Sequence, residues 1–144
     1  MRPWIVFALP SAFSLLLSIS TVGSEVSWQD SGFYLVAIQE MTPLYPPGFV
    51  LYQLLCKAWT LLFFFLDFTL AVHLFSSFCA ALAAGTLALS ARDLLKSRGP
   101  LFQVTSEDPG PLADWAGAAA GCLAASGYTF WASALYAKGY ALYY

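Results

Sequence analysis

Residues 49–66, FVLYQLLCKAWTLLFFFL, form the apolar stretch that decides the fold of this chain. A transmembrane helix needs about 20 apolar residues, so the stretch is nearly long enough to cross a bilayer. It also carries Lys57 near its middle, and a lysine at the bilayer centre costs about 2.5–3.5 kcal/mol. Length therefore favours a membrane span, whereas charge favours a helix on the membrane surface.

The composition is that of an integral membrane protein. Hydrophobic residues make up 60% of the 144 residues and charged residues only 10%, against roughly 25% charged in soluble domains. The formal net charge of −2 and the lack of a lysine- or arginine-rich run argue against a nucleic-acid partner. The three cysteines lie far apart in apolar runs, which argues against a disulfide framework or a zinc site. The partner that the composition predicts is the lipid bilayer.

Basic residues decide which apolar stretches cross the membrane. Three further stretches have the length of spans: 4–20, 68–91 and 115–136. Arg2 precedes the first of them, and a cluster of basic residues at 92, 96 and 98 follows the second. The positive-inside bias places both basic groups in the cytoplasm, which requires an even number of crossings between them. The first two stretches already supply two crossings, so we predict that 48–66 is an interfacial or re-entrant helix on the extracytoplasmic face.

The predicted fold is all-α, with about three transmembrane helices and interfacial helices in the first extracytoplasmic loop, as one membrane domain over residues 1–144. The N-terminus lies in the cytoplasm and the outer loop covers residues 21–67. A cytoplasmic linker broken by proline and glycine covers residues 92–113, and Asp114 is predicted to be the N-cap of the third span. The first stretch also resembles a cleaved secretory signal, although its length and its tryptophan favour a retained anchor.

Small residues at helical spacing predict close packing between spans. Residues 117–121 read Gly-Ala-Ala-Ala-Gly, a GxxxG pattern, and residues 80–85 of the second span are almost as small. Such residues let helix backbones approach each other closely in a membrane. Because alanine-rich helices also contain this pattern by chance, the sequence alone leaves both readings open.

The first outer loop holds a candidate catalytic acid. Asp30 is followed by Ser31-Gly32, where glycine permits close backbone approach, and then by residues 33–41, which have the apolar spacing of a surface helix. The Pro46-Pro47-Gly48 turn ends that helix and starts the next. A carboxylate just outside a span is well placed to act on a lipid-linked substrate whose head group lies at the same depth. The two glutamates of the loop, Glu25 and Glu40, are interpreted as solvated charges.

Three segments together resemble a known membrane family. They are WQDSGFYLVAIQEMTPLYPPGFVLYQLL (28–55), HLFSSFCAALAAGTLAL (73–89) and GYTFWASALYAKGYAL (127–142). In this order and spacing they are similar to the N-terminal part of the bacterial domain of unknown function 2723, which is related to protein O-mannosyltransferases of the GT-C superfold. That family has an Asp-Ser/Cys-Gly-Glu element in the first outer loop and a His-Pro-Pro-Gly turn that opens a surface helix. It also has a Glu-x-Tyr-Ala-Leu element in the second outer loop.

The resemblance implies roles for residues of the two outer loops. Asp30 matches the aspartate that acts as general base, or as an orienting carboxylate, near the acceptor hydroxyl. The implied substrate-binding residues are Tyr45, Pro46, Pro47, Gly48, Lys138 and Tyr140. Phe33, Tyr45 and Lys138 stand where the family has Glu, His and Glu, which leaves a catalytically silent branch open. Lys138 either pairs with Asp30 or the donor phosphate, or extends its ammonium group to the membrane boundary.

The function implied by the resemblance is that of the N-terminal segment of a glycosyltransferase. Such an enzyme moves a sugar from a polyprenyl-phosphate donor to a hydroxyl acceptor, on protein or glycan, at the extracytoplasmic side of the bacterial inner membrane. GT-C enzymes use many spans, so the chain is expected to need the remaining helices of a longer enzyme. No cofactor is expected, because a lone histidine, His73, makes no metal site and the resemblance supports a divalent metal only weakly. The alternative is a non-enzymatic membrane scaffold or assembly subunit.

Overall fold

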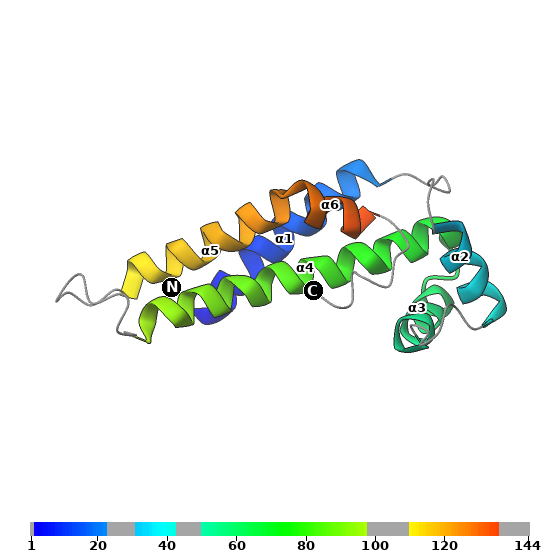
Figure 1. Cartoon of the computed structure of the whole chain (residues 1–144), viewed down its shortest axis with the longest axis horizontal. Helices are drawn as coiled ribbons and strands as arrows, with labels where there is room; N and C mark the ends of the chain where they lie inside the picture. Colours follow the sequence, from blue (N-terminus) through cyan, green and yellow to red (C-terminus); the bar gives the residue numbers. More distant parts are fainter. Residues whose placement is uncertain (1, 23–30, 43–49, 98–109, 136–144) are drawn as a thin grey trace.

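The computed structural model describes residues 2–22, 31–42, 50–97 and 110–135. Within these ranges all regular structure is helical, as the sequence predicts (Figure 1). The helices are α1 (Pro3–Thr21), α2 (Ser31–Glu40), α3 (Val50–Leu62), α4 (Phe68–Lys96), α5 (Gly110–Ser126) and α6 (Tyr128–Leu135).

Helices α1, α4 and α5 pack against one another along the long axis of the molecule (Figure 1). Among the described residues, α1 and α4 are the two helices that are long and apolar enough to cross a membrane, and they match the predicted spans 4–20 and 68–91. Proline at the first helical position suits the start of α1. Asp67 fixes the start of α4, because its Oδ1 accepts the N–H of Leu70 at 3.2 Å.

The predicted third span at 115–136 is not a single helix, and it is not among the helices that are long and apolar enough to cross a membrane by themselves. This part of the chain forms two shorter helices, the 17-residue α5 and the 8-residue α6, which are separated at Gly127. The N–H of Gly127 bonds to the carbonyl of Ala124 at 3.0 Å, three residues back, so the last turn of α5 tightens before α6 begins. Glycine favours such a break because it has one of the lowest helix propensities.

The prediction that Asp114 is the N-cap of this segment is wrong. Helix α5 begins earlier, at Gly110, and Pro111 lies in its first turn, where a missing backbone N–H costs little. Asp114 therefore lies inside the helix, and its side chain faces α4 instead of the backbone of its own helix.

Glycines bring the backbones of the bundle together. A Cβ built on Gly121 would lie 2.8 Å from the carbonyl oxygen of Ala84 and 2.8 Å from Cβ of Pro10, and one built on Gly117 would lie 2.7 Å from the carbonyl oxygen of Ala88. These distances are shorter than real Cβ contacts, so only glycine fits. The GxxxG pattern thus serves packing of α5 on α4 and α1, which settles the alternative that the sequence left open.

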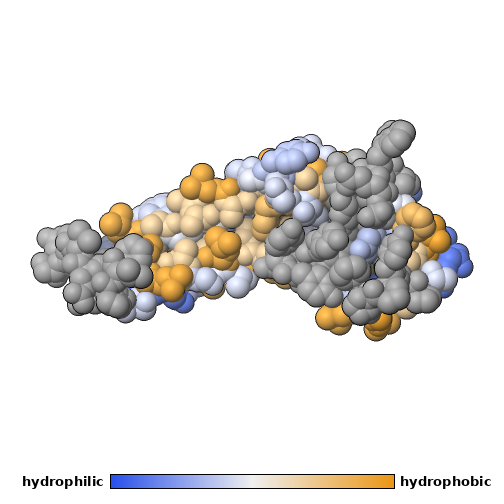
Figure 2. Space-filling model, viewed as in Figure 1, coloured by the Kyte–Doolittle hydropathy of each residue, from blue (hydrophilic) through white to orange (hydrophobic). Residues whose placement is uncertain are grey.

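The outer surface of the bundle is apolar. Orange, hydrophobic residues cover much of the described bundle surface in this view (Figure 2). Large exposed apolar side chains include Leu9, Phe13 and Leu16 on α1 and Leu123 on α5. An apolar surface of this extent is typical of a protein that packs against lipid or further helices, which agrees with the composition.

Helices α2 and α3 form a separate layer at the N-terminal end of α4. In Figure 1, α3 is seen almost end-on while α4 lies in the plane of the view, so α3 runs across α4. Eight buried residues make up the core of this layer: Tyr34, Leu35, Ala37, Ile38, Tyr52, Cys56, Val72 and Phe75. From residue 50 on, the decisive stretch forms the 13-residue α3 followed by a turn, so its helix is shorter than α1 and α4.

Candidate functional site

Two polar side chains on α3 hold the C-terminal end of α2. Gln53 and Lys57 are four residues apart and so lie on one face of the helix. Lys57 Nζ donates to the carbonyl oxygen of Gln39 at 2.9 Å, and Gln53 Nε2 donates to the carbonyl oxygen of Thr42 at 2.8 Å. The lysine that argued against a membrane span thus joins α3 to α2.

The end of α2 is a natural partner for a cation. Met41 adopts φ 52°, and the N–H of Thr42 bonds to the carbonyl of Ala37 at 3.2 Å, which is the 6→1 bond of a Schellman motif. The last carbonyls of a helix carry partial negative charge. Because Lys57 binds one of them, its ammonium group keeps its charge and is held at the end of α2.

A buried hydrogen bond joins this layer to α4. The hydroxyl of Tyr52 lies 3.0 Å from Ser76 Oγ, and both residues are fully buried. The Tyr52 ring meets Tyr34 edge-to-face with centroids 6.1 Å apart. Burial raises the pKa of the Tyr52 phenol far above its usual range, so this group is a neutral structural link and no acid–base catalyst.

The thiol of Cys56 is buried in the same core, which leads to a prediction on its reactivity. Burial raises the pKa of the Cys56 thiol to about 12, so the reactive thiolate is scarce at neutral pH. In a variant that lacks Cys79 and Cys122, we expect native Cys56 to react with a maleimide far more slowly than a cysteine placed at the exposed position 58 by Ala58→Cys in a Cys56→Ala background. Equal labelling rates of the two variants would show that this core is open.

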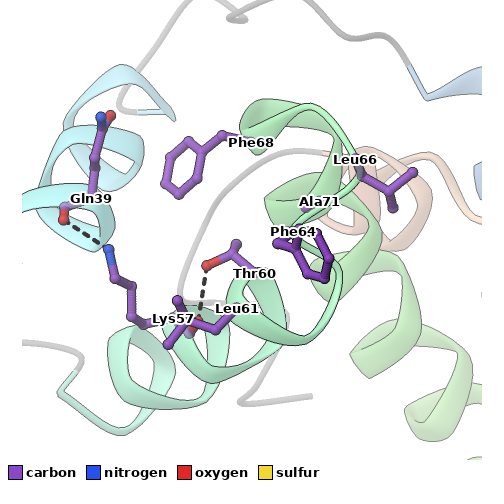
Figure 3. Close-up of a pocket in the computed structure, with 8 residues that line it drawn as sticks. All are labelled: Gln39, Lys57, Thr60, Leu61, Phe64, Leu66, Phe68 and Ala71. Carbon is purple, nitrogen blue, oxygen red and sulfur yellow. Dashed lines mark hydrogen bonds between the residues drawn. The ribbon is translucent and has the colours of Figure 1, made fainter.

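A pocket of about 310 Å³ lies between α2, α3 and the start of α4 (Figure 3). Its lining residues are Gln39, Lys57, Thr60, Leu61, Phe64, Leu66, Phe68 and Ala71. Figure 3 shows Lys57 reaching from α3 toward α2, with Phe68 and Phe64 farther along the wall. The pocket thus has one cationic end and mainly apolar walls.

All the site residues predicted from the sequence lie outside the described part of the chain. These residues are Asp30, Tyr45, Pro46, Pro47, Gly48, Lys138 and Tyr140. In the sequence, Asp30 directly precedes α2, residues 45–48 lie between α2 and α3, and the other two follow α6. Phe33, one of the three departures from the family pattern, lies on α2 with 63% of its surface exposed.

Serine 77 connects α4 to α6. Ser77 Oγ lies 3.0 Å from the carbonyl of His73 in its own helix and 3.1 Å from the carbonyl of Ala134 in α6, and its single O–H serves both acceptors. His73 is buried in α4. The described residues contain no group of three His, Cys, Asp or Glu side chains able to hold a metal.

An ionic cluster at the other end of the bundle was missed from the sequence. Asp114 Oδ1 lies 2.6 Å from Arg92 Nε and 2.7 Å from Lys96 Nζ, and only 3% of the Asp114 side chain is exposed. Arg92 and Lys96 are four residues apart on α4, so they present both charges on one face. The spacing of Arg92 and Lys96 in the sequence was a sign of this cluster. It could be used only if Asp114 was known to lie inside α5.

Comparison with known proteins supplies a family. The family model described as "Protein O-mannosyl-transferase TMEM260 N-terminal domain" matches residues 30–144, which include helices α2 to α6. No curated protein and no solved structure gives a significant match. The match confirms the predicted relation to protein O-mannosyltransferases, whereas the narrower resemblance to the domain of unknown function 2723 and a bacterial origin stay predictions.

Proposed function

Because the chain belongs to the family of the protein O-mannosyl-transferase TMEM260 N-terminal domain, we propose that it is the N-terminal segment of a membrane glycosyltransferase. The observation that carries this proposal is the family match over residues 30–144. Mannose, named in the description of the family, is the proposed sugar. A hydroxyl group on a protein or glycan is the proposed acceptor, and a polyprenyl phosphate is the proposed carrier of the donor sugar.

In the proposed reaction, Asp30 is the general base. It takes the proton of the acceptor hydroxyl while the hydroxyl oxygen forms a bond to the anomeric carbon. The bond from that carbon to the donor phosphate breaks, and the phosphate leaves with the electron pair. Lys138 is proposed to stabilise this phosphate as a point charge, and the turn at 45–48 together with Tyr140 is proposed to line the substrate groove.

The proposed membrane arrangement places the α2–α3 layer on the extracytoplasmic side. Helices α1 and α4 cross the bilayer, the N-terminus lies in the cytoplasm, and α5 with α6 forms a broken third crossing. Two observations support this arrangement: α3 runs across α4, and the charge of Lys57 is bound to a carbonyl at the end of α2. A lysine ammonium group costs less at the membrane surface, where water reaches it, than in the hydrocarbon.

The proposal is tested by Asp30→Asn in the full-length protein, assayed for mannose transfer from a polyprenyl-phosphate mannose donor. We expect turnover to fall by about 100-fold or more, because general-base catalysis typically contributes that much. The matched control is Glu40→Gln, which removes an exposed acid at the end of α2 and is expected to leave turnover unchanged. Unchanged turnover in Asp30→Asn would remove this residue from the mechanism and would favour a scaffold role for the chain. An equal loss in both variants would instead point to damage to α2.

A further inference from the structure

None of the residues proposed to act in sugar transfer is among the described residues that line the pocket beside Lys57. We propose that it binds the phosphodiester group of an anionic phospholipid from the surrounding bilayer, with the first carbons of the lipid against its apolar wall. The depth of the pocket in the membrane rests on the arrangement proposed above, whereas the binding chemistry does not.

The cationic end of the pocket has the donors that a phosphate needs. An ammonium group has three N–H donors, and among the described residues Lys57 uses one of them on the carbonyl of Gln39. As far as the described part of the chain is concerned, the other two donors are available for phosphate oxygens. The bond to Gln39 also holds the ammonium group in position, so a ligand need not fix a freely moving side chain.

The charge of the pocket favours a ligand with a single negative charge. Among the described residues that line the pocket, Lys57 is the only charged one. The acids nearest in the sequence are Glu40 and Asp67, and neither lines the pocket. The Asp67 carboxylate is occupied as the N-cap of α4. One positive charge neutralises a phosphodiester, which carries one negative charge, whereas a phosphate monoester, which carries nearly two, would leave a negative charge against the apolar walls.

The apolar wall continues onto an exposed apolar surface. Leu61 and Phe64 line the pocket and are 67% and 83% exposed, and the neighbouring Leu62 and Phe65 are each 69% exposed. Large apolar side chains exposed side by side mark a contact with lipid or another apolar partner. At about 310 Å³ the pocket is at the lower end of the range for ligand sites, which suits a head group and its adjoining carbons but not a whole lipid.

The test is native mass spectrometry of the purified full chain in detergent, with dioleoyl phosphatidylglycerol as the probe and dioleoylglycerol, which lacks the phosphate, as the reference lipid. We expect phosphatidylglycerol to stay bound and dioleoylglycerol to dissociate. Lys57→Gln should weaken phosphatidylglycerol binding by about tenfold, as expected for loss of a charge-assisted hydrogen bond, and Lys57→Arg should retain it. Arg2→Gln, which removes another exposed basic residue, is the matched control and should bind like the wild type.

A second variant keeps the proposal testable if Lys57→Gln loosens α2. Phe64→Ala shortens the apolar wall at a residue that is mostly exposed and leaves the bond between Lys57 and Gln39 in place. It should weaken phosphatidylglycerol binding without changing the thermal unfolding midpoint. Equal binding of both lipids, or tighter binding of a polyprenyl-phosphate mannose than of phosphatidylglycerol, would overturn the proposal. Neither outcome bears on Asp30, because no sugar transfer is measured.

Discussion

Replacing Gly121 with leucine is expected to prevent α1, α4 and α5 from forming their bundle. A Cβ at this position would already lie 2.8 Å from the carbonyl oxygen of Ala84, 2.8 Å from Cβ of Pro10 and 2.9 Å from Cβ of Ala88. Two of these atoms belong to the backbone of α4 or to a rigid proline ring, so no side-chain rotation relieves the clash. Overpacking typically costs about 1–3 kcal/mol, and a leucine placed against backbone is at the upper end of that range or beyond it.

The measurement is the thermal unfolding midpoint of the purified protein in detergent, together with the fraction that elutes as a single species in size-exclusion chromatography. Ala119→Leu is the matched control, because it adds the same kind of side chain to an exposed position of α5. We expect Gly121→Leu to lower both quantities strongly and Ala119→Leu to leave them near the wild-type values. Similar midpoints for the two variants would mean that α5 does not pack on α4 as closely as the structure has it.

The long helices α1 and α4 were predictable because their signals are local. Hydropathy and an N-terminal proline define α1, and hydropathy defines most of α4. Charge parity and Lys57 predict that α3 lies on the membrane surface, and this stays a prediction. The structure adds that Lys57 binds the carbonyl of Gln39 at the end of α2. The sequence could not show this partner, because Gln39 contributes a backbone carbonyl, which every residue has.

The features that were missed depend on residues that are distant in the sequence or on small differences in helix propensity. The break at Gly127 lies within a stretch that is apolar throughout, so hydropathy passes over it. The contact between Asp114 and Arg92 joins residues 22 positions apart across a linker. The catalytic candidates came from resemblance alone, and Asp30 with its implied partners lies outside the described residues. Their roles therefore stay predictions, which the substitution of Asp30 tests directly.

Replacing Asp114 with asparagine is expected to separate the ends of α4 and α5. Arg92 Nε and Lys96 Nζ both bind Asp114 Oδ1, at 2.6 and 2.7 Å. An amide keeps the shape of the carboxylate but loses its charge and presents N–H groups on one side. Lys96 and Arg92 would then lose the anion between them, and Arg92, whose side chain is only 14% exposed, would keep its longer contact with the exposed Asp93. Removing one partner of a buried ion pair is strongly destabilising, because a desolvated charge loses its strongest interaction.

The measurement for Asp114→Asn is again the thermal unfolding midpoint, with limited proteolysis between α4 and α5 as a local readout. Asp93→Asn is the matched control, because Asp93 also contacts Arg92, at 3.3 Å, but is 68% exposed. Exposed ion pairs contribute little to stability, because water screens them. We therefore expect the decrease in midpoint to be several-fold larger for Asp114→Asn, with faster cleavage between the two helices. Equal decreases for the two variants would contradict a clamp at Asp114. A larger decrease in the midpoint of Asp114→Asn would mean that Asp114 fixes the register of α5 on α4. In this register, Gly117 and Gly121 lie against the carbonyls of Ala88 and Ala84.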